Sequence, residues 1–283
     1  MTLLVDDPGL LSLVQDGGRP GRGHLGVSVS GAFDRGALRQ VNSVLGNPVG
    51  AAGIEVLGGG LVLRAMTRHV VAVTGSAGAI TIDGRPAAYG RALHLAPGQP
   101  LRVGASGSGL RAYVGVAGGL DVPAELGSAS TDTLSGLGPA RLSAGVVLGV
   151  GPPTTPPDIE DVLPLTRSGD LVLDVVLGPR DDWFTDAAVR ALLDEPWQVS
   201  AASDRVGVRL LGPVLDRLVT TELPSEPCVR GSIQVAADGQ PIVFGPDHPV
   251  TGGYPVIAVV VDAHTDRLAQ AAPGQVARFA RRP

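Results

Sequence analysis

Short apolar runs that end at Gly, Pro, Asp or Asn recur in both halves of the chain. Most of them span four to seven residues, which is typical of strands in barrels and sandwiches. Two of the runs contain Asp-Gly between β-rich flanks, at residues 83–84 and 238–239, and this dipeptide favours a hairpin turn. We predict strands within residues 69–75, 79–84, 101–105, 111–119, 145–151, 171–178, 233–245 and 256–262.

Helical periodicity is confined to a few segments. Residues 33–48 place leucine and valine on one face, with Asp34 as the expected N-cap. A second helix is predicted within 184–197, capped by Thr185 or the following aspartate, and 265–274 is a candidate for a short third helix. Strands and helices do not alternate as a parallel sheet requires, so the pattern predicts a mainly β fold with a few short helices.

Residues 151–170 interrupt this pattern. They contain five prolines and several small polar residues, and they show neither helical nor strand periodicity. Proline at this density favours an extended connector. We therefore predict a β-rich N-terminal subdomain over 1–150, a Pro-rich linker over 151–170, and a β-rich C-terminal subdomain over 171–283.

Composition narrows the chemistry. The chain has 283 residues and a formal charge of −5, without a basic block that would suggest nucleic-acid binding. It contains no lysine, which excludes a Schiff base, a phosphate-loop lysine and a biotinylated lysine. The single cysteine excludes an internal disulfide, and the five histidines lack metal-ligand spacing, so no metal site is expected. Neither a signal peptide nor an apolar run of membrane-spanning length is present, and a cytoplasmic location is expected.

Familiar catalytic motifs are missing, but four polar clusters stand out. "GASGSGLRAY" leads into a strand rather than a helix, so it is not a dinucleotide fingerprint, and "GVSVSG" lacks the context of a nucleophile elbow. The clusters lie within residues 14–34, 128–138, 203–212 and 222–255. In the third, a surface ion pair involving Asp204, Arg205 and Arg209 is the simplest interpretation. In the fourth, glycines allow close backbone approach while amides and hydroxyls supply directed hydrogen bonds, which suits a neutral amide or ureido ligand.

These clusters, with the text around them, resemble one family. Residues 9–34, 109–132, 203–212 and 232–255 are similar, in the same order, to the biotin-dependent carboxyltransferase family that includes the 5-oxoprolinase C subunit, also called allophanate hydrolase subunit 2. The likeness covers nearly the whole chain. It departs from the usual pattern at Arg230, where the family often has a small residue or proline, and at Val250, where threonine is commoner.

The resemblance implies two cyclophilin-like β-barrel subdomains, a partner of the B-subunit type and a lactam-utilisation protein of the A-subunit type. One implied activity is the ATP-dependent opening of 5-oxoproline to L-glutamate, with ATP bound on another subunit because this chain shows no ATP site. The alternative is carboxyl transfer from carboxybiotin, carried by a partner, to urea or another amide. A second alternative is a non-catalytic regulatory partner of the B-type protein, and a serine-hydrolase interpretation has no nucleophile context to support it.

Site residues follow from the clusters and from the resemblance. Asp16 and Arg19 are expected to form an orienting pair, and Glu226 or Asp34 is the candidate base. The other candidate catalytic residue is Tyr254; the substrate-binding candidates are Ser30, Ser225, Gln234, Gln240, Thr251, Gly252 and Gly253. The loop "DHPVTGGYP" is interpreted as a turn that leads into the strand after it, and within it the threonine, the glycine pair and the tyrosine are favoured over His248.

Overall fold

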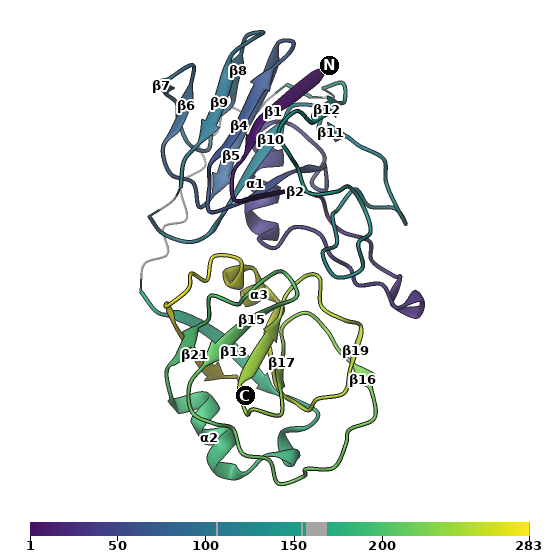
Figure 1. The fold of residues 1–283 in the computed structure, drawn as a ribbon, viewed down its shortest axis with the longest axis vertical. Coiled ribbons are helices and arrows are strands. Elements are labelled where there is room, and N and C mark those ends of the chain that lie inside the picture. Colours follow the sequence, from purple (N-terminus) through teal and green to yellow (C-terminus); the bar gives the residue numbers. More distant parts are fainter. Residues whose placement is uncertain (106, 154, 157–168, 283) are drawn as a thin grey trace. The chain divides into compact units, whose positions relative to one another are not determined.

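The computed structural model describes residues 1–105, 107–153, 155–156 and 169–282. They form two compact units, shown in Figure 1. Unit 1 comprises the described residues of Met1–Arg19, Ser30–Asp132 and Gly136–Arg167. Unit 2 comprises Pro20–Val29, Thr133–Ser135 and the described residues of Ser168–Pro283. Most of the predicted linker lies outside the described residues, so the boundaries at 150 and 171 stay predictions.

The described residues of unit 1 form two antiparallel sheets and one α-helix. A seven-stranded sheet has the order β11-β12-β1-β4-β9-β6-β7, and a five-stranded sheet has the order β2-β3-β10-β5-β8. The strands of unit 1 are β1 (Thr2–Pro8), β2 (Leu11–Gln15), β3 (Gly53–Leu57), β4 (Leu61–Ala65), β5 (His69–Gly75), β6 (Ile80–Ile82), β7 (Arg85–Pro86), β8 (Leu93–Leu95), β9 (Pro100–Val103), β10 (Arg111–Val116), β11 (Leu120–Asp121) and β12 (Val147–Val150).

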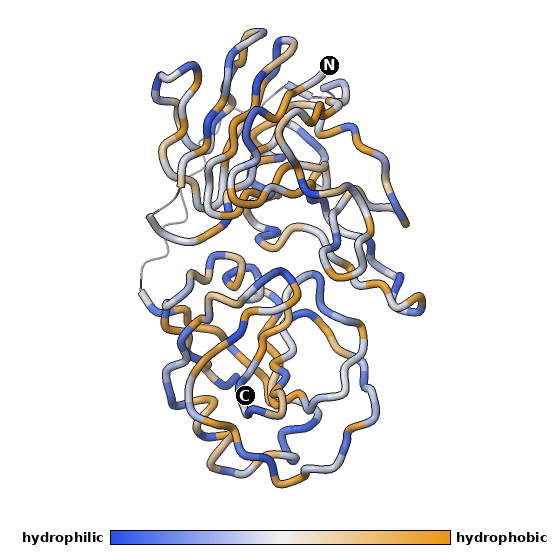
Figure 2. The backbone as a smooth tube through the Cα atoms, viewed as in Figure 1, coloured by the Kyte–Doolittle hydropathy of each residue, from blue (hydrophilic) through white to orange (hydrophobic). Residues whose placement is uncertain are grey.

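Both sheets contribute aliphatic side chains to one core. The core is built almost entirely from valine, leucine, isoleucine and alanine, among them Val5, Val56, Leu63 and Leu101. Figure 2 shows the same distribution along the backbone, with apolar stretches on the strands and hydrophilic stretches at many turns. Burial alternates along β1 and β9, as expected for strands with one solvated face, whereas every residue of β10 is buried.

The predicted Asp-Gly hairpin in unit 1 is confirmed. Asp83 and Gly84 have positive φ values of 51° and 75°, and they connect β6 to β7. Positive φ at both central residues is what a two-residue type I′ turn requires, and it matches the twist of the flanking strands. The turn therefore has a local sequence cause.

Helix α1 (Arg35–Val44) packs against the five-stranded sheet. Its N-cap is Asp34, whose carboxylate accepts a hydrogen bond from Ala37 N at 2.9 Å, as predicted. Leu38 and Val41 are buried together with Tyr113 of β10 in a second apolar cluster. The amphipathic pattern thus places one helix face on the sheet.

Unit 2 contains a closed seven-stranded barrel with the order β13-β20-β17-β18-β15-β14-β21. The barrel closes through a parallel pairing of β13 with β21, and its other pairings are antiparallel. Strands β16 and β19 form a separate two-stranded sheet. The strands are β13 (Leu171–Leu177), β14 (Trp197–Val199), β15 (Gly207–Leu211), β16 (Glu226–Pro227), β17 (Ser232–Val235), β18 (Pro241–Phe244), β19 (Thr251–Gly252), β20 (Val256–Val260) and β21 (Val276–Arg281).

The helices of unit 2 are short. They are the 3₁₀ segments η1 (Gly23–Leu25) and η2 (Asp181–Trp183) and the α-helices α2 (Asp186–Asp194) and α3 (Asp262–Leu268). The third helix starts three residues before the predicted segment. Two β-rich units with few short helices confirm the predicted fold class. The strands of unit 2 form a closed barrel, whereas those of unit 1 form two sheets.

Helix α2 offers a test of its predicted cap. The Thr185 hydroxyl accepts a hydrogen bond from Ala188 N at 3.0 Å. Thr185→Ala is expected to lower the free energy of unfolding by about 1 kcal/mol because a helix N–H loses its acceptor. Thr185→Ser keeps the acceptor and serves as the control in denaturant titrations. Equal losses in both variants would contradict the capping role.

Candidate functional site

The Asp16 carboxylate, directly after β2, accepts four hydrogen bonds, three of them from a serine-containing segment of unit 1. It accepts from Gly18 N at 2.7 Å, Ser128 Oγ at 2.6 Å, Ala129 N at 2.7 Å and Ser130 Oγ at 2.5 Å. The first bond is a local turn, whereas the other three reach more than 110 residues along the chain. Asp16 therefore fixes the position of residues 128–130.

Arg19 is buried beside the same segment. Its Nη2 donates to the carbonyl of Ser130, and its Nε donates to the carbonyl of Glu125 at 3.4 Å. Asp16 and Arg19 thus bind one segment, each through its own set of hydrogen bonds. The predicted pairing is indirect, through Ser130.

Two buried polar atoms near this segment have no hydrogen-bond partner within the described residues. They are Nη1 of Arg19 and Oε1 of Gln15. The Nε2 atom of the same Gln15 side chain donates a hydrogen bond to the carbonyl of Thr131 at 2.8 Å. An unsatisfied buried donor or acceptor is costly unless a ligand or water pairs with it. These atoms support a polar ligand or ordered water in this part of unit 1.

Ser30 and Asp34 occupy structural positions in the same unit. Ser30 has a positive φ of 55° and its hydroxyl lies 3.4 Å from the carbonyl of Thr131. Asp34 is 3% exposed, and its carboxylate caps α1. A carboxylate that accepts from helix N–H groups is held in place, which favours the capping role over that of a mobile base.

A buried network behind Asp34 was not predicted. The Tyr113 hydroxyl donates to Glu55 Oε2 at 2.6 Å and accepts from Asp34 N at 2.7 Å. Arg111 Nε lies 3.4 Å from Glu55 Oε1, and its guanidinium stacks on the ring of Phe33. Burial, and then the nearby Glu55 carboxylate, raise the pKa of Tyr113 well above its usual value, so the hydroxyl stays protonated as a donor.

Most of the predicted unit 2 residues gather around the β16–β19 sheet. Glu226 of β16 pairs with Gly252 of β19, and Thr251 pairs with Pro227. The Glu226 carboxylate forms a forked ion pair with Arg180, whose Nε lies 3.0 and 3.1 Å from the two carboxylate oxygens. This geometry fixes the orientation of the carboxylate.

Gln234 of barrel strand β17 is hydrogen-bonded to the loop that follows β19. Its Nε2 donates to the carbonyl of Tyr254 at 2.9 Å. A Cβ at position 252 would lie 2.5 Å from that amide nitrogen and 3.2 Å from Cys228 Sγ, so a side chain there would displace the Gln234 amide. Tyr254 is 46% exposed, with the Arg217 guanidinium 5.7 Å from its ring centroid. Glu226, Gln234, Gly252 and Tyr254 are therefore brought together.

Gln240, another candidate in unit 2, lies apart from these contacts. Its side chain is bonded to Gly212, accepting from its N–H at 2.9 Å and donating to its carbonyl at 3.2 Å. Ser225, which precedes Glu226, is exposed. Thr251 in β19 and Gly253 just after β19 are exposed as well. The structure thus leaves Ser225, Thr251 and Gly253 accessible, while Gln240 supports a turn.

The expected surface ion pair of residues 203–212 is wrong. Arg205 is 3% exposed and Asp247 is 0% exposed, and they form a bidentate pair with both N···O distances at 2.9 Å. Asp247 Oδ2 also accepts from Thr133 N at 2.9 Å and from Thr133 Oγ1 at 2.8 Å. Asp204 instead accepts from the N–H groups of Val206 and Gly207 in a turn. The partners are distant in sequence, so local spacing gave no signal.

His248 is buried next to Asp247. Its ring stacks on Phe244 with centroids 5.8 Å apart, and Nδ1 lies 2.8 Å from the carbonyl of Pro249. Over the part of the chain that the structure describes, no group of three or more His, Cys, Asp or Glu is arranged to hold a metal ion. In the same residues, no helix has the length and apolar character of a membrane span.

Comparison with known proteins places these features in context. A model of the carboxyltransferase domain, subdomains A and B, matches residues 25–281. The 5-oxoprolinase C subunit of Escherichia coli (strain K12) is 36% identical to this chain over 274 residues, which cover 96% of this chain and 88% of that protein.

Solved structures with similar folds cover nearly the whole of this chain. The crystal structure of TTHA0988 is similar with a TM-score of 0.89 and 38% identity over 99% of this chain. The Kluyveromyces lactis urea carboxylase is similar with a TM-score of 0.93 and 29% identity over 100% of this chain. This chain spans 55% of the TTHA0988 chain and 27% of the urea carboxylase chain.

Proposed function

This chain belongs to the carboxyltransferase-domain family with subdomains A and B, and we propose that it acts as the C subunit of a bacterial 5-oxoprolinase complex. In that role it contributes, with the A and B subunits, to the ATP-dependent opening of 5-oxoproline to L-glutamate in the cytoplasm. The observation that carries the proposal is the 36% identity to a protein of that name, because it extends over 96% of this chain and 88% of the relative.

Lactam opening makes three demands on a site. The carbonyl must be polarised, water must reach its carbon, and the ring nitrogen must gain a proton as the C–N bond breaks. The exposed end of the β16–β19 sheet offers hydroxyl donors at Thr251 and Tyr254, together with the backbone of Gly253. We assign to these groups the binding of the substrate carbonyl.

Glu226 is the base in this proposal. Its carboxylate is partly exposed and is held in one orientation by the ion pair with Arg180. The bond from Gln234 to the Tyr254 carbonyl keeps the loop against the barrel, so Gln234 positions the site. Asp16, Arg19 and Ser30 remain substrate-binding candidates of unit 1, and Asp34 remains the second candidate base. ATP is assigned to another subunit.

Reconstitution tests this proposal. The chain is mixed with its A-type and B-type partners, and glutamate is measured after addition of 5-oxoproline and ATP. We expect glutamate only when this chain, both partners and ATP are all present. Equal glutamate formation by the partners without this chain would refute a role as an essential subunit.

Carboxyl transfer is the alternative function, and the likeness to urea carboxylase over 100% of this chain and 27% of that chain favours it. In that reaction a base removes a proton from the acceptor nitrogen, which attacks the carboxyl carbon of carboxybiotin as the bond to the biotin nitrogen breaks. Because this chain has no lysine, a partner would carry the biotin. This alternative predicts a reaction that requires the biotinylated partner and that avidin inhibits.

Substitution at Glu226 separates catalysis from a purely regulatory role. Glu226→Gln keeps the size of the side chain but removes the base and weakens the bond to Arg180. We expect kcat of the reconstituted complex to fall at least tenfold, since general base catalysis contributes about 10²–10⁴-fold. Glu222→Gln, at an exposed carboxylate nearby in sequence, is the control. Unchanged kcat in Glu226→Gln and in Tyr254→Phe would favour the non-catalytic alternative.

A further inference from the structure

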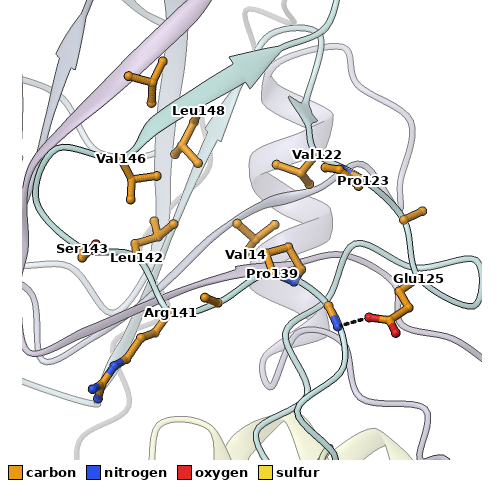
Figure 3. A pocket seen from close by; sticks show the side chains of 14 residues that line it. Val14, Val122, Pro123, Glu125, Pro139, Arg141, Leu142, Ser143, Val146 and Leu148 are labelled. Atoms are coloured by element: carbon orange, nitrogen blue, oxygen red, sulfur yellow. Dashed lines mark hydrogen bonds between the residues drawn. The ribbon is translucent and has the colours of Figure 1, made fainter.

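Unit 1 contains a cavity of about 610 Å³ between β2, the segment after β11 and the segment that leads into β12. Its wall is mainly apolar, with Val14, Val122, Pro139, Leu142 and Leu148 among the lining side chains (Figure 3). A space of this size accommodates a small molecule, and apolar walls with few polar groups are the usual character of ligand sites. The function proposed above does not use this cavity.

One hydrogen bond joins two residues of the cavity wall, Glu125 and Gly138. The side chain of Glu125 is exposed, and its Oε2 accepts a hydrogen bond from Gly138 N at 2.8 Å, drawn as a dashed line in Figure 3. Both residues line the cavity. A backbone N–H at the cavity wall therefore already binds a carboxylate oxygen, and that carboxylate belongs to an exposed side chain.

A buried positive charge lies behind the same part of the wall. Arg19 Nε donates to the carbonyl of Glu125, and a Cβ at position 138 would lie 3.3 Å from Arg19 Nη2. Arg19 is 1% exposed and is bonded to carbonyl oxygens, with no carboxylate partner and with Nη1 unpartnered within the described residues. A buried charge without a counter-ion favours binding of an opposite charge nearby.

Gly138 makes this arrangement possible. Its φ is 82°, and a Cβ there would come within 2.1 Å of the Ser130 carbonyl that Arg19 binds. A side chain at position 138 would therefore collide with the Ser130 carbonyl, and glycine is required there. Arg19 lies behind the wall and does not line the cavity; the positively charged residue that does line it, Arg141, extends away from the apolar side chains in Figure 3. The buried positive charge next to Glu125 and Gly138 is that of Arg19.

We propose that this cavity binds a small carboxylate with an apolar body. The ligand carboxylate takes the place of the Glu125 carboxylate at the N–H of Gly138, where the buried guanidinium of Arg19 attracts it. The apolar body lies against the valine, leucine and proline side chains. Glu125 acts as the resident competitor that closes the site when the ligand is absent.

Binding of three probes of equal length to the full chain tests the proposal. Hexanoate, hexanol and hexylamine are titrated by calorimetry and by ligand-observed NMR. We expect hexanoate to bind at least tenfold more tightly than hexanol and hexylamine. Equal binding of all three would show an apolar cavity without carboxylate recognition and would overturn the proposal, and no binding of hexanoate would overturn the site itself.

Three variants locate the binding. Glu125→Gln removes the competing charge and is expected to tighten hexanoate binding about tenfold, because a neutral amide competes less well for the N–H of Gly138. Asp121→Asn makes the same charge change at an exposed residue outside the cavity wall and is expected to have no effect. Ala124→Phe, at an exposed lining position, is expected to abolish binding by filling the cavity. Unchanged affinity in Glu125→Gln or in Ala124→Phe would contradict the proposal.

Discussion

Asp247→Asn is expected to lower the free energy of unfolding by about 3–5 kcal/mol, because it leaves a buried arginine without its counter-charge. Asp247 and Arg205 form a bidentate pair at 2.9 Å, with 0% and 3% of their side chains exposed. The same carboxylate accepts two hydrogen bonds from Thr133. Chemical denaturation of the purified full chain measures the loss.

Asp170→Asn provides the matched control. Asp170 forms an ion pair with Arg278 at 2.8 Å, but both side chains are about half exposed, at 44% and 46%. Exposed pairs of this kind contribute about 0–1 kcal/mol. If Asp247→Asn cost no more than Asp170→Asn, the buried pair would not stabilise the barrel unit as the structure indicates.

Asp16→Asn is expected to have the second largest effect, a loss of about 1–3 kcal/mol with faster amide exchange in residues 128–130. Asparagine keeps one acceptor oxygen, but its NH₂ group faces either the Ala129 N–H or the serine hydroxyls. At least one buried donor of this segment then loses its acceptor. Hydrogen exchange of the Ala129 and Ser130 amides reports the change directly.

Asp7→Asn separates this effect from that of a local turn. The Asp7 carboxylate accepts a hydrogen bond from Gly9 N at 2.9 Å, in the same manner as Asp16 accepts from Gly18 N. This bond is local and does not reach residues 128–130. We expect Asp7→Asn to leave the amide exchange rates of residues 128–130 unchanged. If Asp16→Asn and Asp7→Asn gave the same exchange rates there, Asp16 would not hold the segment.

The elements with local causes were predictable from sequence. The Asp83-Gly84 turn needs positive φ at both residues, and the caps of α1 and α2 need a short acceptor side chain before the helix. Strand β5 was predicted with its observed bounds, His69–Gly75. Each of these features is set by residues within one turn or one strand.

Features that depend on distant partners were not predictable from one sequence. The Arg205–Asp247–Thr133 contacts join residues 42 and 114 positions apart, and Tyr113 meets Glu55 across 58 positions. No local pattern signals such pairings. Resemblance to the family pointed to the loop of Gly252 and Tyr254, but the ion pair of Glu226 with Arg180 required the fold.

We propose that this chain serves lactam opening rather than carboxyl transfer. The most direct test is glutamate release from 5-oxoproline and ATP by the chain reconstituted with its A-type and B-type partners, with excess avidin present. We predict glutamate formation at the same rate with and without avidin, and no product when this chain is omitted. Absence of glutamate, or its loss on addition of avidin, would contradict a role in lactam opening.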